Sequence, residues 1–286
     1  MKLPPFEYAC PTDLTEAVAL LAARDGDAKL LAGGQSLVPM LAFRLAAPAL
    51  LVDLRKLPDL RKIDISAGGV VLGSMVRWCD ILDHACLRTA HPLLVAAVEH
   101  VAHYQIRNRG TVGGSIAHAD PAAELPGIVV TCEADIATVG AAGPRVIRAA
   151  DFFVGPLMTV LEPDEIIVEI RFPAWPARRR WGFQEFARRR GDFAMAAAAV
   201  WYDEDQDGKA CNAHVGAIGV GDVPQRLRAV EAVLNGRFID EATIAQAEAA
   251  ASAAVDPQTD IHASADYRRA LVGTMVERAL LNARKS

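Results

Sequence analysis

The sequence predicts an α+β protein that ends in a small domain of antiparallel sheet and helices. Through residues 1–177, short apolar runs of strand length alternate with segments that carry apolar residues at helical spacing. After residue 178, three strand-like runs are followed by three helical segments, an order typical of a sheet backed by helices. Between these parts, residues 172–177 (Phe-Pro-Ala-Trp-Pro-Ala) have the composition of a domain junction.

Residues 1–57 are expected to form a βαβ-like unit. Thr12 and Asp13 are expected to cap a helix, because Leu14, Ala17, Val18 and Leu21 recur at helical spacing after them. Strands are expected at residues 29–32 and 50–54. Between them, a helix is expected to begin after Ser36 and to run through Leu37, Met40, Leu41 and Leu45.

Residues 58–177 are expected to form a second α+β unit. In the last of its strands, Ile166, Val168 and Ile170 alternate with Ile167, Glu169 and Arg171, which predicts one buried and one exposed face. Pro121 stands where proline is favoured, at the first position of a helix. The expected strands are 70–74, 136–139, 146–148 and 166–172, and the expected helices are 78–87, 92–103 and 121–131.

Residues 178–286 are expected to form the C-terminal domain. The acidic turn at residues 204–208 separates two of its strands, and Asn235-Gly236 ends its first helix. The expected strands are 181–187, 195–202 and 210–220, and the expected helices are 225–234, 240–255 and 265–286.

Composition excludes several classes of protein. The chain has 286 residues, of which 52% are hydrophobic and 23% charged, enough for two or three subdomains with their own cores. A net charge of −5 argues against a nucleic-acid-binding protein, which normally has a basic face. The two basic runs, Arg178 to Arg180 and Arg188 to Arg190, are interpreted as solvated or phosphate-facing edges.

The sequence contains no sign of a membrane span, a metal site or a nucleophile. No apolar run is long enough to cross a bilayer, and residues 1–7 lack the apolar core of a signal peptide, so we expect a cytoplasmic protein. The five cysteines are scattered without a C-x-x-C, so any iron–sulfur cluster must lie in another chain. His100 and His103 are expected on one helix face, without further zinc ligands. The absence of a nucleophile favours a protein that carries a cofactor.

Two glycine motifs carry the strongest functional signal. Ala32 to Ser36 (Ala-Gly-Gly-Gln-Ser) and Thr111 to Ser115 (Thr-Val-Gly-Gly-Ser) each place two glycines and a serine between apolar runs. Glycine lets the backbone approach a ligand closely and turn its N–H groups toward an anion. Ser36 is expected to cap the helix that follows, with Pro39 in its first turn, which would direct the positive helix end at the same point. We therefore expect the two loops to hold one diphosphate, although each glycine pair alone is typical of an ordinary turn.

The longer sequence segments around these motifs resemble those of a known family. Ala-Gly-Gly-Gln-Ser-Leu-Val-Pro-Met-Leu and Ile-Arg-Asn-Arg-Gly-Thr-Val-Gly-Gly-Ser-Ile-Ala-His-Ala-Asp-Pro resemble the two FAD-diphosphate loops of the flavoprotein (medium) subunits of the xanthine oxidase and carbon monoxide dehydrogenase family. The resemblance covers essentially the whole chain. It implies a two-lobed FAD-binding domain of the vanillyl-alcohol-oxidase-like (PCMH) type, with lobes at 1–57 and 58–177, and a C-terminal domain at 178–286. Residues 260–264 resemble most the medium subunits of enzymes of the quinoline 2-oxidoreductase type.

The resemblance also implies roles for particular residues. Glu124 would bind a ribityl hydroxyl, and Leu161 and Ile167 would line the adenine and dimethylbenzene parts of the pocket. Asp192 would contact the cofactor region, with Phe193 beside the isoalloxazine. His118 would approach the flavin or its ribityl side, although a local helix-entry role stays open for it. Gln184 stands where some relatives have lysine, and Asp120 is either a cap or a ligand. The loop residues implied to bind FAD are Leu31, Ala32, Gly33, Gly34, Gln35, Ser36 and Leu37, with Thr111, Gly113, Gly114 and Ser115.

The function that the resemblance implies is electron transfer within a molybdenum hydroxylase. A large subunit with molybdopterin would oxidise the substrate, and a small subunit with two [2Fe–2S] clusters would pass the electrons on. FAD in this chain would collect them and reduce an external acceptor, within a dimer of heterotrimers. Two alternatives stay open: a self-contained FAD oxidoreductase with His118 or Tyr104 as its acid or base, and a non-catalytic assembly subunit whose glycine loops are structural.

Overall fold

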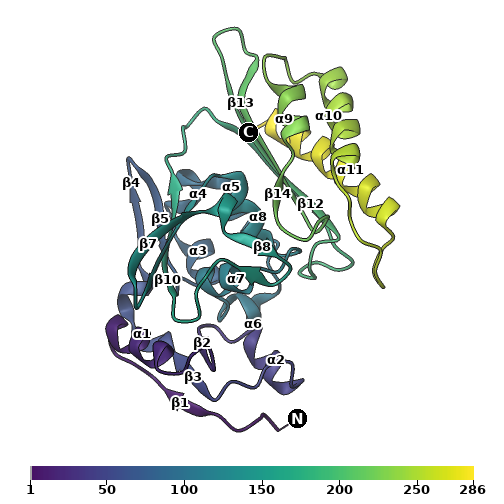
Figure 1. Cartoon of the computed structure of the whole chain (residues 1–286). Coiled ribbons are helices and arrows are strands. Elements are labelled where there is room, and N and C mark those ends of the chain that lie inside the picture. Colours follow the sequence, from purple (N-terminus) through teal and green to yellow (C-terminus); the bar gives the residue numbers. More distant parts are fainter. Residues whose placement is uncertain (1) are drawn as a thin grey trace.

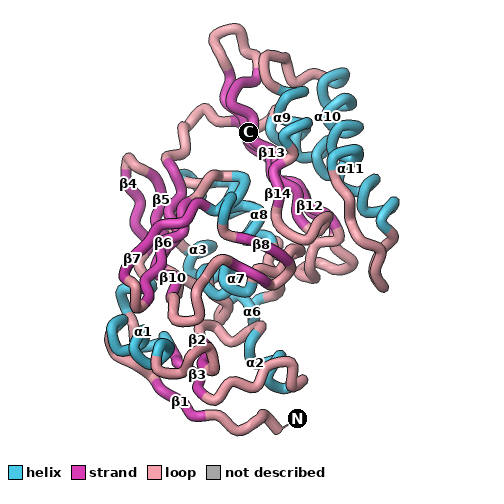
Figure 2. Tube along the Cα trace, in the orientation of Figure 1, coloured by secondary structure: helices cyan, strands magenta, loops and turns pink. Residues whose placement is uncertain are grey.

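The computed structural model describes residues 2–286 and confirms an α+β fold with two lobes and a C-terminal domain (Figure 1). A small parallel sheet near the N-terminus, a five-stranded antiparallel sheet and a four-stranded antiparallel sheet follow one another along the chain, and Figure 2 separates their strands from the helices. Each part has its own cluster of buried apolar side chains. None of the helices within residues 2–286 is long and apolar enough to cross a bilayer.

The N-terminal lobe is built on three parallel strands in the order β1-β3-β2. Asp13 caps the first helix as expected, since its carboxylate accepts a hydrogen bond from the N–H of Glu16 at 2.9 Å. The short strand β1 was not predicted, because its three residues carry no clear alternation. The elements are β1 (Glu7–Ala9), α1 (Leu14–Ala22), β2 (Ala28–Leu31), α2 (Leu37–Ala42), β3 (Leu50–Asp53), η1 (Leu54–Lys56) and η2 (Pro58–Arg61).

The helix after the first glycine motif begins at Leu37 as expected, but its cap and its end differ from the prediction. Ser36 has helical dihedral angles and makes no capping hydrogen bond, so the expected cap was wrong. The helix also stops at Ala42, before Leu45, because Arg44 adopts a left-handed conformation with φ of 59°. With only six residues, α2 adds little dipole to the loop before it.

The second lobe contains the five-stranded sheet, in the order β4-β5-β10-β6-β7. Its helices cover the sheet and carry the second glycine motif in α7 (Figure 1). Strand β4 and the short hairpin of β8 and β9 were not predicted. The elements are β4 (Ile63–Ser66), β5 (Gly69–Gly73), α3 (Trp78–Asp83), α4 (Leu87–Ala90), α5 (Pro92–Val98), α6 (Tyr104–Arg107), α7 (Val112–His118), α8 (Glu124–Thr131), β6 (Asp135–Gly140), β7 (Gly143–Arg148), η3 (Ala149–Asp151), β8 (Phe153–Gly155), β9 (Met158–Thr159) and β10 (Ile166–Pro173).

All three predicted helices of this lobe have different limits. The helix expected at 78–87 ends at Asp83, and Leu87 begins a separate helix, α4. The helix expected to reach residue 103 ends at Val98, so His100 and His103 do not share a helix face. The helix expected to begin at Pro121 begins at Glu124, because Asp120 accepts a hydrogen bond from the N–H of Ala122 at 2.9 Å and holds a turn there.

Strand β10 does not keep the simple alternation that its sequence indicates. A bulge between Ile167 and Glu169 shifts its register against β6. Ile166 therefore packs into the core of the first lobe, whereas Ile167 and Ile170 pack into the core of the second. Because of the bulge, side chains of the single strand β10 pack into the cores of both lobes.

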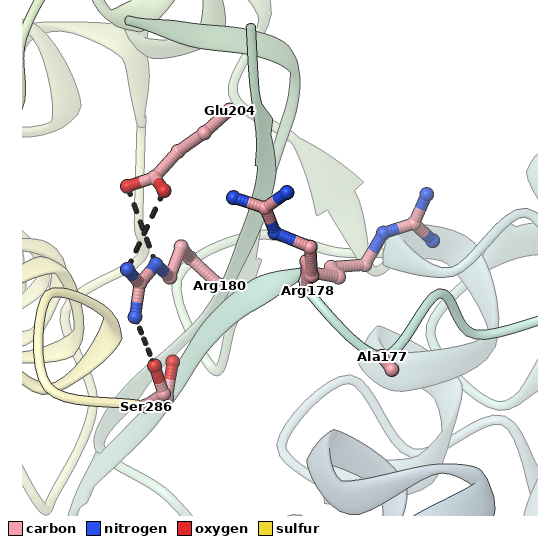
Figure 3. A pocket seen from close by; sticks show the side chains of 6 residues that line it. Ala177, Arg178, Arg180, Glu204 and Ser286 are labelled. Atoms are coloured by element: carbon pink, nitrogen blue, oxygen red, sulfur yellow. Dashed lines mark hydrogen bonds and ion pairs between the residues drawn. The ribbon is translucent and has the colours of Figure 1, made fainter. Parts of the chain in front are cut away.

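The C-terminal domain is an antiparallel sheet in the order β11-β12-β13-β14, packed against α11 and, through β13, against α8 of the second lobe. The helix expected from residue 225 is preceded by a two-residue strand and starts at Arg228. The elements are β11 (Arg180–Phe186), β12 (Ala196–Glu204), β13 (Ala210–Ile218), β14 (Gln225–Arg226), α9 (Arg228–Leu234), α10 (Glu241–Ala254) and α11 (Ala265–Ala283). Arg180 lies between Glu204 and Ser286 and joins the end of α11 to the sheet (Figure 3).

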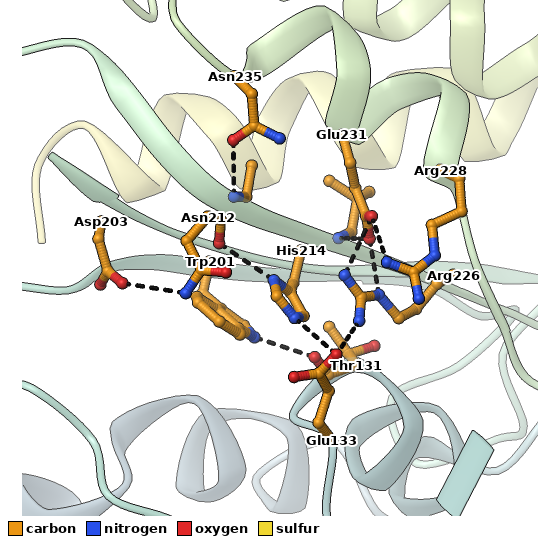
Figure 4. A network of polar contacts seen from close by, with 12 residues as sticks. Thr131, Glu133, Trp201, Asp203, Asn212, His214, Arg226, Arg228, Glu231 and Asn235 are labelled. Carbon is orange, nitrogen blue, oxygen red and sulfur yellow. Dashed lines mark hydrogen bonds and ion pairs between the residues drawn. The ribbon is translucent and has the colours of Figure 1, made fainter. Parts of the chain in front are cut away.

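A polar network joins this sheet to α8 (Figure 4). The indole N–H of Trp201 donates to the carbonyl oxygen of Thr131 at 3.0 Å, and the imidazole of His214 stacks on the indole with 3.8 Å between ring centroids. Glu133 accepts from Arg226, whose guanidinium also pairs with Glu231. These contacts fix the C-terminal domain against the second lobe.

Candidate cofactor-binding cavity

A cavity of about 1170 Å³ lies where the three parts of the chain meet. Its walls come from the first glycine motif, the second glycine motif, strand β10, the loop between β11 and β12, and α11 with the segment before it. Pockets for drug-sized ligands measure roughly 300–1000 Å³. The cavity is therefore large enough for a ligand of dinucleotide size.

The two glycine motifs lie against each other in one wall of the cavity. A Cβ on Gly33 would lie 2.8 Å from the carbonyl carbon of Arg109 and 2.9 Å from the Cα of Gly110. A Cβ on Gly114 would lie 3.8 Å from the Cβ of Ala32. Glycine at residue 33 is therefore required by the close approach of residues 109 and 110.

The first motif presents free backbone donors to the cavity. Within residues 2–286, the N–H groups of Gly33, Gly34, Gln35 and Ser36 donate no hydrogen bond to any protein group. The side chain of Gln35 donates to the carbonyl oxygen of Gly33 at 3.0 Å, which holds the turn. Four adjacent free N–H groups suit an anionic oxygen, because backbone amides are obligatory donors.

The second motif differs from the expectation that its amides face the ligand. It forms the first turn of α7, where Thr111 is the N-cap, and the N–H groups of residues 112–115 already have acceptors within the protein. Among the described residues, the N–H of Thr111 and the hydroxyl of Ser115 have no protein acceptor, and both residues line the cavity. The N–H of Val112 donates to the carbonyl oxygen of Val76, and the N–H of Gly113 donates to that of Ser74. The N–H of Gly114 donates to the hydroxyl oxygen of Thr111, and the N–H of Ser115 donates to the carbonyl oxygen of Thr111.

Glu124 brings a buried carboxyl group to the cavity wall. The residue is 6% exposed at the first position of α8. Burial, with the negative charges of Glu185 and Asp120 adding to it, raises the pKa of Glu124 to about 8. The group is therefore mostly neutral at pH 7 and presents both a donor and an acceptor to a ligand.

The structure brings almost all the predicted site residues together. Leu31 does not line the cavity, since it ends β2 while its neighbour Leu30 contributes to the wall. Tyr104, the second acid or base considered for a self-contained oxidoreductase, is 69% exposed and is not part of the lining. The predicted residues that line the cavity are Ala32, Gly33, Gly34, Gln35, Ser36, Leu37, Thr111, Gly113, Gly114, Ser115, His118, Glu124, Leu161, Ile167, Asp192 and Phe193.

Several lining residues were missed by sequence reasoning. Ser74 follows β5, and its buried hydroxyl has no hydrogen-bond partner. Arg268 of α11 donates to the carbonyl oxygens of Met195 and Gly219 and to the carboxylate of Asp260. No local pattern marks these residues, because only the packing of the C-terminal domain on the second lobe brings α11 to the wall.

The residues present fit a dinucleotide. The cavity combines free amides at one motif, hydroxyls at the other, a neutral acid at Glu124 and apolar side chains at Leu161 and Ile167. Within residues 2–286, no group of His, Cys, Asp and Glu side chains is arranged to hold a metal ion. The free amides, the hydroxyls and the apolar side chains of the lining suit an organic cofactor.

Comparison with known proteins agrees with this chemistry. Residues 4–175 match the family described as the FAD-binding domain in molybdopterin dehydrogenase, and residues 181–283 match the carbon monoxide dehydrogenase flavoprotein C-terminal domain. The chain is 38% identical over 283 residues to the nicotine 6-hydroxylase medium subunit of Paenarthrobacter nicotinovorans, covering 99% of each chain. It is 37% identical over 277 residues to the carbon monoxide dehydrogenase medium chain of Hydrogenophaga pseudoflava, covering 97% of this chain and 96% of the relative.

Solved structures give the same result. The carbon monoxide dehydrogenase of Hydrogenophaga pseudoflava matches with a TM-score of 0.96 at 39% identity. Quinoline 2-oxidoreductase of Pseudomonas putida 86 matches with a TM-score of 0.94, also at 39% identity, and both matches cover 100% of this chain and 99% of the other. The chain belongs to the FAD-binding medium subunits of the xanthine oxidase and carbon monoxide dehydrogenase family of molybdenum hydroxylases.

Proposed function

We propose that this chain holds FAD in the cavity and carries electrons from an iron–sulfur small subunit to an external acceptor, in a complex whose large subunit binds molybdopterin. The observation that supports this most is that both glycine motifs face one cavity, where the first motif offers four unpaired backbone N–H groups. Bound FAD supplies the exchange of one or two electrons, which connects one-electron clusters to a two-electron oxidation.

The chain's own residues bind and orient the cofactor in this proposal. The amides of residues 33–36 donate to the diphosphate, and the hydroxyl of Ser115 donates from the opposite motif. Glu124 in its neutral form exchanges hydrogen bonds with a ribityl hydroxyl while its burial excludes water. Leu161 and Ile167 contact the adenine and dimethylbenzene parts, and His118, Asp192 and Phe193 lie toward the flavin ring.

The arrangement of domains and subunits completes the proposal. We divide the chain into lobes at 1–57 and 58–177 and a C-terminal domain at 178–286, and we assign the complex as a dimer of heterotrimers. All five cysteines are unpaired, which supports a cytoplasmic location. Two of them, Cys79 and Cys211, are partly buried, and each has a raised thiol pKa.

The first experiment is an absorbance spectrum of the protein expressed alone, followed by chromatography of the nucleotide released on denaturation. A flavin spectrum with released FAD supports the proposal. Co-expression with the two partner chains then tests the complex, and activity that needs all three chains supports the electron-transfer role. A colourless protein that takes up no added FAD contradicts it and leaves the assembly role. Turnover by this chain alone indicates a self-contained oxidoreductase.

A further inference from the structure

The loop between β11 and β12 places three arginines at the rim of the cavity. Arg188, Arg189 and Arg190 are all exposed, and within residues 2–286 their side chains make no hydrogen bond or ion pair. Arg188 and Arg189 line the cavity. By contrast, Arg179 and Arg180 of the other arginine run pair with Asp203 and Glu204.

The arginine loop is held in place at two points. Gly191 has φ of 88°, and a Cβ there would lie 2.6 Å from the carbonyl oxygen of Ala102. The same oxygen accepts a hydrogen bond from Arg107 at 2.7 Å. Farther along, the N–H of Ala194 donates to the carbonyl oxygen of Ala122 at 3.3 Å. These contacts fix the backbone of the loop, so Arg188 and Arg189 stay in the cavity lining and Arg190 stays next to them.

The rim is locally positive on a chain with net charge −5. Asp192 is the one carboxylate of the loop. Among the other acidic residues that line the cavity, Asp260 pairs with Arg268 at 2.8 Å and Glu165 pairs with Arg145, which leaves Asp120 beside the buried Glu124. Next in the loop after Asp192 is Phe193, whose ring is 60% exposed and lines the cavity. Unpaired guanidinium groups beside an exposed aromatic ring suit an anionic molecule, because Arg forms forked hydrogen bonds with anionic oxygens.

We propose that Arg188, Arg189 and Arg190 form the docking site for the external electron acceptor and that this acceptor is a small anion. The proposal rests on the proposed function, since it requires FAD in the cavity with its ring toward Phe193. The arginines attract the anion to the open side of the cavity and so raise its encounter rate. A neutral acceptor gains nothing from them.

The test compares two triple variants of the FAD-loaded full chain. The rim variant is Arg188→Gln/Arg189→Gln/Arg190→Gln. The control, Arg178→Gln/Arg278→Gln/Lys285→Gln, removes the same charge from exposed side chains outside the cavity lining, and Arg178 carries no polar contact in Figure 3. Any effect of net charge alone must appear in both.

The first readout is quenching of flavin fluorescence in the oxidised protein by iodide and by acrylamide. We expect the rim variant to lower the iodide quenching constant at least about twofold at low salt, because iodide is attracted by the arginines. Acrylamide is neutral, so its quenching constant is expected to stay the same in all three proteins.

The second readout is stopped-flow reoxidation of the dithionite-reduced protein by ferricyanide and by neutral benzoquinone. FADH⁻ gives one electron to each of two ferricyanide ions and releases one proton, which yields FAD and two ferrocyanide ions. We expect the rim variant to slow the ferricyanide reaction about 10-fold at low salt and to flatten its salt dependence. The benzoquinone rate and the control variant are expected to match the wild type.

Three results would overturn the proposal. Equal losses in the rim and control variants would show a general charge effect, and unchanged rates would show that the arginines do not face the flavin. Loss of FAD from the rim variant would assign the arginines to the cofactor instead. A wild-type chain that binds no FAD would refute the proposed function itself, a result distinct from the other three.

Discussion

Gly33 and Arg109 bring the two glycine motifs into direct contact, because the Cα of Gly33 packs on the carbonyl group of Arg109 so closely that no side chain fits between them. The motifs are separated by about 80 residues in sequence. Their contact turns two local turns into one wall of the cavity. Ligand binding and the packing of the first lobe on the second therefore depend on the same glycine.

Replacing Gly33 by Ala is expected to weaken folding and FAD binding together. The added Cβ overlaps the backbone of residues 109 and 110, and overpacking of this kind costs about 1–3 kcal/mol. Urea unfolding of the FAD-free protein measures the first effect, and fluorescence titration with FAD measures the second. Gly68→Ala is the control, since a Cβ there meets nothing closer than 3.5 Å. Normal stability with normal affinity would show that the motifs do not share one wall.

Gly34→Val and Gly114→Val are expected to remove FAD from a folded protein. Gly34 has φ of 72°, which a branched side chain adopts only with strain, and its free N–H lies in the cavity wall. A Cβ on Gly114 would lie 2.8 Å from the hydroxyl oxygen of Thr111 and would disturb the cap of α7. Flavin content per chain checks the loss, and circular dichroism checks the fold. Full flavin in both variants would rule out the two-loop model.

Glu124→Gln is expected to change how stability depends on pH. The pKa of Glu124 is raised from its ordinary value of 4.5 to about 8, so the folded chain holds this proton more tightly than the unfolded chain does. The contribution of the Glu124 proton to the free energy of unfolding is complete below pH 4.5 and is lost as pH rises toward about 8. Melting temperatures of the FAD-free protein between pH 5 and pH 9 check this.

The glutamine variant stays neutral, so its melting curve should decline less across that interval. If FAD binding buries the carboxyl group further, the FAD affinity of the wild type also falls as pH rises through about 8, and that of the variant does not. Parallel pH profiles in the two proteins would contradict the assignment of a neutral acid.

Ser74→Ala is expected to leave the FAD-free protein as stable as the wild type, or up to about 1 kcal/mol more stable. The Ser74 hydroxyl is buried without a hydrogen-bond partner. Folding removes this hydroxyl from water without compensation, and the alanine variant avoids that cost in free energy. The backbone of Ser74 keeps its bonds to Val168 and Gly113 in the variant. Thermal unfolding beside Ser66→Ala, whose hydroxyl accepts a bond from Gly68 on the surface, measures the difference. A clear loss of stability would mean that the hydroxyl has a partner.

Trp201→Phe is expected to destabilise the joint between the C-terminal domain and the second lobe by about 1–3 kcal/mol. The change leaves the buried carbonyl oxygen of Thr131 without its indole donor and weakens the stack with His214 (Figure 4). It also weakens the contact of the Arg179 guanidinium with the indole ring. Urea unfolding followed by far-UV circular dichroism measures the loss. Trp181→Phe serves as the matched control because Trp181 donates no side-chain hydrogen bond in the described residues. Equal stability of the two variants would show that the bond contributes nothing.

The sequence alone determined the fold class and the family, and almost all of the residues that it nominated for the site line the cavity. It did so because each glycine motif is a local pattern with a local cause, and because long apolar runs such as Ala196 to Tyr202 have few alternatives to a buried strand. Asp13 and its helix were likewise predictable, since capping acts over a single turn.

Only the tertiary structure decided which groups are free to act. The amides at Gly113 and Gly114 are occupied because α7 folds back on Ser74 and Thr111, whereas those at Gly33 and Gly34 stay unpaired. The bulge in β10, the neutral carboxyl of Glu124 and the approach of Arg268 depend on segments far apart in sequence. Hydrogen-bond pairing and burial are properties of packed neighbours, and no local pattern in the chain specifies those neighbours.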